Sequence, residues 1–144
     1  MGEDDLTSTD ELELARVAAF RTQLRRFLRR TDVVTSQAGL TTQRYDLLLM
    51  LKSADHDGHG VRVTDLCELL QLQQTAVTEL VKRSEQAGLI DRRPSADDGR
   101  LSLLRLTAEG ERRLLQVFNA LRHDRQTLGA AFKDLDELFQ AASR

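Results

Sequence analysis

Two strand-like segments lie close together in a chain that otherwise shows helical spacing. LIDRRP (89–94) and LSLLRL (101–106) are joined by six residues, a length that suits a hairpin. The joining loop reads Ser-Ala-Asp-Asp-Gly and then presents Arg100 at its tip. The only proline is Pro94, so long helices are uninterrupted before and after it. The pattern predicts a mainly helical protein with one small β-hairpin, an α+β fold.

Apolar residues recur at helical spacing over the remaining segments. The predicted helices cover residues 8–34, 40–54, 64–72 and 73–88, and a last helical region follows Thr107. We expect Thr41, Thr64 and Thr107 to act as N-caps of the helices that they precede or begin. VRV at 61–63 predicts a short strand. The residues expected to face inward from the two central helices are Leu66, Cys67, Leu70, Ala76, Val77, Leu80 and Val81.

The formal net charge of −2 hides an uneven distribution. Residues 1–15 carry six acidic residues and no basic ones, which leaves 21 basic against 17 acidic residues in the rest of the chain. That balance is compatible with a nucleic-acid partner. No apolar run approaches the roughly 20 residues of a membrane span, and the acidic start is unlike a signal peptide. Because the single cysteine, Cys67, allows no intrachain disulfide, we expect a cytoplasmic protein without a membrane partner.

The two central helices are joined by the short turn LQLQQ, an order typical of a helix-turn-helix. Such a pair is able to place its second helix in the major groove of DNA. Glutamine pairs bidentately with adenine, and threonine donates, accepts or contacts a thymine methyl. The predicted base-reading residues are Gln73, Gln74, Thr75 and Thr78. Lys82 and Arg83 lie further along the helix and suit phosphate contacts.

A hairpin beside a recognition helix is able to reach the adjacent minor groove. A narrow minor groove has a concentrated negative potential that attracts arginine, and Arg100 is placed to enter it. Asp98 precedes it by two residues, and we expect its carboxylate to orient the guanidinium of Arg100 through a fork-like pair. Gly99 between them is expected to permit a positive φ in the turn.

These stretches resemble the MarR family of bacterial transcription regulators. LTTQRYDLLLML (40–51) is similar to the second helix of that family, and residues 63–110 resemble its helix-turn-helix and wing without a gap. The strongest parts are GLIDRRP, the Asp98-x-Arg100 pair and LTAEG. Three positions depart from the pattern: Ser84 replaces a usual leucine, Cys67 a usual alanine and Gly99 a common arginine.

The resemblance implies a winged helix-turn-helix lobe at 39–107 and a helical dimerisation region built from 1–38 and 108–144. It implies a homodimer that binds pseudo-palindromic double-stranded DNA, with half-sites about one helical turn (~10 bp) apart. It further implies a small-molecule effector, aromatic or acidic, whose binding changes the spacing of the recognition helices. The expected effector residues are Val17, Phe20, Arg21, Tyr45 and Leu48, with Arg16 as a second candidate arginine. Plain core packing is the alternative interpretation of this apolar set.

We therefore expect a ligand-responsive transcriptional regulator, a repressor of a nearby operon. One alternative is a winged-helix module that binds protein, because residues 61–106 hold seven bases and seven acids. Another is a metal- or redox-responsive regulator that uses His56, Asp57 and His59 or Cys67. That histidine loop offers too few ligands for a stable site, and a cysteine on an inner helix face is usually a small apolar residue. We expect no metal, no cofactor and no enzymatic activity, since no nucleophile or acid–base arrangement is present.

Overall fold

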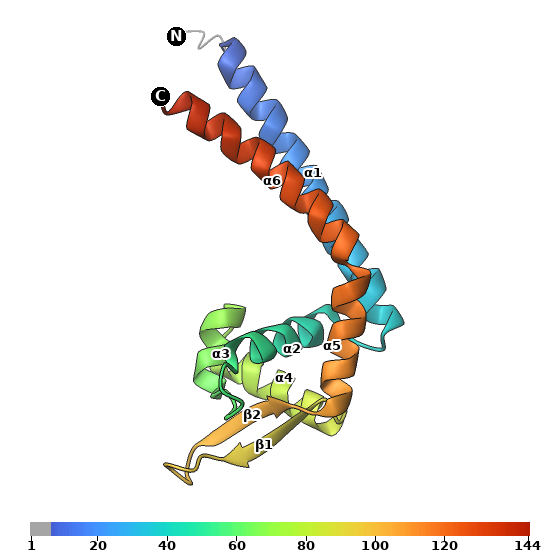
Figure 1. The fold of residues 1–144 in the computed structure, drawn as a ribbon, viewed down its shortest axis with the longest axis vertical. Helices are drawn as coiled ribbons and strands as arrows, with labels where there is room; N and C mark the ends of the chain where they lie inside the picture. Colours follow the sequence, from blue (N-terminus) through green and yellow to red (C-terminus); the bar gives the residue numbers. More distant parts are fainter. Residues whose placement is uncertain (1–6) are drawn as a thin grey trace. The chain divides into compact units, whose positions relative to one another are not determined.

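The computed structural model describes residues 7–144 as two compact units (Figure 1). The helical unit contains residues up to Val33 and from Ala120 onward, and the lobe runs from Val34 to Asn119. The acidic residues at positions 3–5 lie outside the described part. Within residues 7–144, the helices lack the length and apolar character of a membrane span.

The helical unit consists of two long helices that run antiparallel, side by side (Figure 1). These are α1 (Ser8–Gln37), whose last turn belongs to the lobe, and α6 (Arg122–Ala142). The rings of Phe20 and Phe132 meet edge to face with centroids 6.0 Å apart. Further along, Arg30 Nε lies 3.7 Å from Asp124 Oδ2. The helix predicted for 8–34 is therefore confirmed and ends three residues later.

The lobe is a helical domain closed by one β-hairpin. Its elements are α2 (Thr42–Ala54), α3 (Val63–Leu70), α4 (Gln74–Gln86), β1 (Ile90–Pro94), β2 (Ser102–Leu106) and α5 (Ala108–Ala120). The strands pair antiparallel from Ile90 opposite Leu106 to Pro94 opposite Ser102. Leucine and valine side chains from the helices and β2 form its core, including Leu47, Leu51, Leu66, Val77, Val81 and Leu104. This arrangement confirms the predicted α+β fold.

The helix starts follow the predicted capping chemistry in two of three places. Thr41 caps α2 by accepting a hydrogen bond from the Arg44 backbone N–H at 3.2 Å, and Thr107 Oγ1 accepts from Gly110 N at 3.0 Å. The prediction for Thr64 is wrong, because α3 begins one residue earlier and its N-cap is Arg62. Because α3 begins at Val63, the strand predicted at 61–63 is reduced to a single β-bridge between Val61 and Leu104.

Helix α5 packs within the lobe, which extends this unit beyond the boundary expected at residue 107. Gly110 lies against the backbone of Leu89 so closely that a Cβ there would collide with the Leu89 carbonyl. Arg113 Nη1 donates to the carbonyls of Ala38 and Gly39, each at 3.4 Å. The start of α5 is thereby held against both the loop after α4 and the end of α1.

Candidate nucleic-acid interface

A tight turn joins α3 to α4. Gln71 adopts a left-handed conformation, with φ 53° and ψ 44°, and its backbone N–H reaches the last carbonyls of α3. The Leu72 N–H donates to the Cys67 carbonyl at 3.2 Å, and Gln73 is then extended as the N-cap of α4. The chain direction therefore changes within three residues, which is the geometry of a helix-turn-helix.

Helix α4 is divided into a buried face and a polar exposed face. Val77, Leu80, Val81 and Ser84 are buried, whereas Ala76, predicted to face inward, is exposed. The predicted inward position of Ala76 is therefore wrong. The predicted recognition residues Gln73, Gln74, Thr75, Thr78, Lys82 and Arg83 are all exposed. The α4 surface thus offers amides, hydroxyls and cations to the solvent.

The two cations of α4 differ in their surroundings. Arg83 Nε donates to Glu79 Oε1 at 3.0 Å, an ion pair between residues four apart on the exposed face. Lys82 makes no ion pair or side-chain hydrogen bond within residues 7–144. The two cations were predicted to be equivalent phosphate contacts, but the i, i+4 spacing of Glu79 and Arg83 already indicates this ion pair.

The loop of the hairpin is ordered by its own short polar side chains. Ser95 Oγ accepts from the backbone N–H groups of Asp97 and Asp98 at 3.3 and 3.4 Å. Asp98 Oδ1 accepts from the backbone N–H of Arg100 at 3.0 Å. The expected pair between Asp98 and the guanidinium of Arg100 is therefore wrong: the carboxylate holds the backbone of the turn. Gly99 also lacks the expected positive φ.

As a result, the guanidinium of Arg100 is exposed and unpaired among the residues that the structure describes. The hairpin is nevertheless fixed to α4, because Arg92 on β1 donates to Glu85 Oε1 through Nη2 at 2.6 Å and through Nε at 3.2 Å. The sequence did not predict this pair, because Glu85 and Arg92 lie seven residues apart across a turn. The ion pair joins the recognition helix and the wing into one surface.

Residues 38–101, which contain this surface, match the sequence model of the MarR family. A crystal structure of a MarR-family transcription regulator is 26% identical, with a TM-score of 0.66, and the match covers 88% of this chain and 78% of that one. Over residues 38–101 the chain is therefore similar to the MarR family. This confirms the resemblance noted in the sequence and the winged-helix fold.

Two further proteins are similar to this chain. An uncharacterized HTH-type transcriptional regulator of Bacillus subtilis (strain 168), YdgJ, is 33% identical over 76 residues, which are 53% of this chain and 44% of YdgJ. The match therefore spans less than half of that relative. The MepR–DNA complex of S. aureus has a TM-score of 0.69 at 23% identity, covering 85% of this chain and 89% of MepR. The relatives named here are regulators, and none is named as an enzyme.

Ser84, the departure from the family's leucine, is fully buried under α4. Its hydroxyl donates to the Leu80 carbonyl of the preceding turn at 2.8 Å. The polar group is therefore satisfied inside the helix, so the substitution places no unpaired donor in the core.

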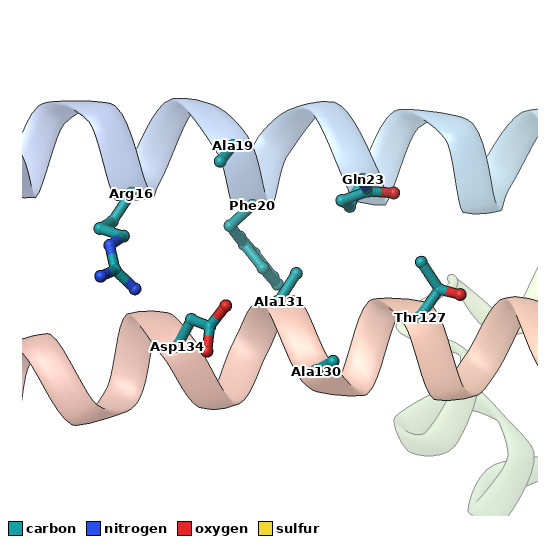
Figure 2. A pocket seen from close by; sticks show the side chains of 8 residues that line it. All are labelled: Arg16, Ala19, Phe20, Gln23, Thr127, Ala130, Ala131 and Asp134. Carbon is teal, nitrogen blue, oxygen red and sulfur yellow. The ribbon is translucent and has the colours of Figure 1, made fainter.

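The residues expected to bind an effector fall into different units of the structure. Tyr45 and Leu48 are buried in the lobe. Val17 and Phe20 are half-buried in the helical unit, and Arg21 is exposed. A cavity of about 280 Å³ lies between α1 and α6, and Figure 2 shows Arg16, Phe20 and Asp134 directed into it. Its other lining residues are Ala19, Gln23, Thr127, Ala130 and Ala131.

The lobe contains the two candidate sensing groups, the histidine loop at 56–59 and Cys67. His56, Asp57 and His59 are exposed, and within residues 7–144 no three potential ligands converge on a metal site. Asp57 Oδ1 instead accepts from the His59 backbone N–H at 3.2 Å. Cys67 is half-buried on α3.

Proposed function

We propose that this protein is a ligand-responsive transcriptional repressor that binds pseudo-palindromic double-stranded DNA as a homodimer. The observation that carries the proposal is the joint surface of α4 and the wing. It presents a row of exposed amides and hydroxyls, and the Arg100 guanidinium on the same lobe has no partner in the part of the chain that the structure describes. The DNA complex of MepR, whose fold is similar, supports it.

In the proposed complex α4 lies in the major groove. Gln73, Gln74, Thr75 and Thr78 face base edges, where amides and hydroxyls discriminate between bases. Lys82 contacts the backbone directly, whereas Arg83 must exchange Glu79 for a phosphate. The turn ordered by Asp98 presents Arg100 to the adjacent minor groove.

The proposed dimer forms through the helical unit. Helix α6 has no buried residue, and large apolar side chains of both helices are exposed, with Phe132 at 59% and Leu14 at 56%. Leu12, Leu28 and Phe139 add to this apolar surface. Exposed large apolar side chains on one helical unit are typical of an interaction site, and a second copy of the same helices supplies a self-complementary partner.

The proposed effector is an aromatic or acidic small molecule. Arg16 and Phe20 in the cavity between α1 and α6 offer a guanidinium for a carboxylate and a ring for an aromatic group. Val17 and Arg21 neighbour these residues on α1. Tyr45 and Leu48 are buried in the lobe, so they contribute through packing. Such a ligand must favour a dimer geometry that fits DNA poorly, because equal affinity for both geometries shifts nothing.

The proposal is tested by selecting duplexes from a random-sequence pool with the full chain. We expect an inverted repeat with half-sites about 10 bp apart and one dimer bound per duplex. The affinity for that duplex should fall steeply with salt, because each neutralised phosphate releases counterions. A protein that is monomeric, or that enriches no duplex, contradicts the proposal. Salt-insensitive capture of a protein partner instead would favour an interaction module.

A further inference from the structure

A second concave surface lies on the lobe, where the end of the wing meets the start of α3. It encloses about 310 Å³ and is lined by Arg62, Val63 and Thr64 on one side and by Arg100, Leu101 and Ser102 on the other. The sequence places these two segments almost forty residues apart. The fold brings them together because Val61 bridges to Leu104 of β2, with backbone hydrogen bonds of 2.9 and 2.8 Å.

The lining of this groove is suited to an anion. Two arginines, Arg62 and Arg100, are among its lining residues, and no acidic residue is. Thr64 and Ser102 add two hydroxyls, which are able to donate to an oxyanion. A tetrahedral phosphate diester has two non-bridging oxygens that share one negative charge and point in different directions. Donors from both lining segments match this arrangement.

Arg62 is held in place by its own helix. Its Nε and Nη2 atoms donate to Asp65 Oδ2 and Oδ1 at 3.2 and 3.3 Å. A guanidinium has five N–H donors, so three remain after this pairing. The Arg62 side chain is 55% exposed. The Asp65 carboxylate therefore restrains the guanidinium and leaves donors for a further oxyanion.

We propose that this groove binds one phosphate of the DNA backbone, with Arg62 as its principal contact and Thr64 and Ser102 as supporting donors. The inference rests on the proposed function and adds to it a contact outside the recognition helix and the wing tip. Because Arg100 belongs to the same groove, the bound phosphate lies at the edge of the minor groove that Arg100 probes. Binding of this phosphate would set the depth at which the wing enters the minor groove.

The test compares Arg62→Gln with Arg112→Gln on the duplex selected by the wild-type chain. Arg112 is a matched control: it is an exposed arginine that also makes a bidentate pair three residues away, with Glu109 at 2.9 and 2.7 Å, and it does not line the groove. We expect Arg62→Gln to weaken binding about 3- to 20-fold, because it removes one exposed charge-assisted contact. The slope of log affinity against log salt should become shallower by about one.

The loss in Arg62→Gln should be equal for the selected duplex and for a scrambled one, since a phosphate contact carries no sequence information. Arg112→Gln should bind as the wild type does. Thermal unfolding of both variants confirms that the lobe is folded. Thr64→Val, which removes the hydroxyl and keeps the shape, should lower the affinity in the same direction by a smaller factor.

The possible failures are distinguishable. If the wild-type chain binds no duplex, the proposed function fails and this inference with it. If the wild type binds and Arg100→Ala weakens binding, but a folded Arg62→Gln keeps both the affinity and the salt slope of the wild type, the phosphate site alone is overturned. An equal loss in Arg112→Gln also overturns it, because the effect then reflects net charge.

Discussion

Thr107 Oγ1 donates a hydrogen bond of 2.6 Å to the Gly88 carbonyl, and the same oxygen accepts the backbone N–H of Gly110 at 3.0 Å. One hydroxyl therefore caps α5 and ties it to the loop that ends α4. We expect Thr107→Val, which keeps the shape and removes both bonds, to lower the free energy of unfolding by about 1–3 kcal/mol. Thr107→Ser keeps the hydroxyl and should cost less than half as much. Chemical denaturation measures both, and equal losses would show that the methyl group matters instead.

Gly110 is the second point at which α5 and the loop after α4 are joined. A side chain there collides with the Leu89 backbone, which has no flexible end to move away. We expect Gly110→Ala to lower the free energy of unfolding by about 1–3 kcal/mol or more. Gly129→Ala is the control, because nothing lies within 4 Å of its added methyl in α6. There, replacing glycine in a helix should raise stability by about 0.5–1 kcal/mol. Equal and small effects at both sites would contradict the close approach.

Local patterns in the sequence were sufficient for most of the fold. Helical spacing located α1, α2 and α4, and threonine before an apolar stripe identified the caps Thr41 and Thr107. Both signals arise within a few residues, so a single sequence contains them. The N-cap prediction for Thr64 was wrong because Val63 is already helical. A hydroxyl residue in the first turn of a helix gives the same sequence pattern as an N-cap.

The candidate site was only partly predictable from the sequence. Exposure of the α4 residues followed from their spacing, but two polar pairings and the groove beside the wing did not. Arg100 offers Asp98 two possible donors, its backbone N–H and its guanidinium, and the carboxylate accepts from the backbone N–H. The Glu85–Arg92 pair and the groove that contains Arg62 depend on how the hairpin returns toward the helices. Such contacts between distant segments leave no periodic signal.

Asp46 on α2 gives a pH-dependent prediction. Burial raises the pKa of the Asp46 carboxyl above its usual value of 3.8. An acid with a raised pKa in the folded state is destabilising at neutral pH, and this penalty disappears as the pH falls through the raised pKa toward the unfolded value. Asp46→Asn should therefore raise Tm at pH 7, and the gain should shrink toward pH 3.8. If the rise in Tm is the same at every pH, it comes from packing and not from the charge of Asp46.

Glu109 provides a control of opposite sign. Hydrogen bonds from Arg112 and Arg113 lower the pKa of Glu109 from 4.5 to about 2. A lowered pKa contributes stability that is present above 4.5 and is lost as the pH falls toward 2. Glu109→Gln should therefore lower Tm at pH 7 and have less effect at low pH. Thermal scans of both variants across the same pH series must diverge from the wild type in opposite directions.

Glu79 restrains Arg83, one of the two exposed cations of α4 that we propose contact DNA. Its carboxylate accepts from Arg83 Nε at 3.0 Å on the exposed face of the helix. We expect Glu79→Gln to raise the affinity for the selected duplex about 2- to 5-fold, because it frees Arg83 and removes a negative charge close to phosphates. Lys82→Ala should weaken binding by a similar factor on every sequence. A loss of affinity in Glu79→Gln would mean that Glu79 itself reads a base. In that case the duplex selected by the variant would differ from the wild-type duplex at one position.

Arg100 decides whether the wing takes part in recognition. Its guanidinium is exposed and unpaired among residues 7–144, so in the proposed complex it would contact DNA without first breaking an intramolecular contact. We expect Arg100→Ala to weaken binding to the selected duplex by about 1–3 kcal/mol. The loss should be largest when an A-tract lies beneath the wing, because its narrow groove concentrates negative potential, and smallest when that segment is G·C-rich. Fluorescence anisotropy on the two duplexes measures the difference, and Arg100→Lys should retain part of the affinity with less preference. Unchanged affinity in a folded Arg100→Ala variant would remove the wing from the mechanism.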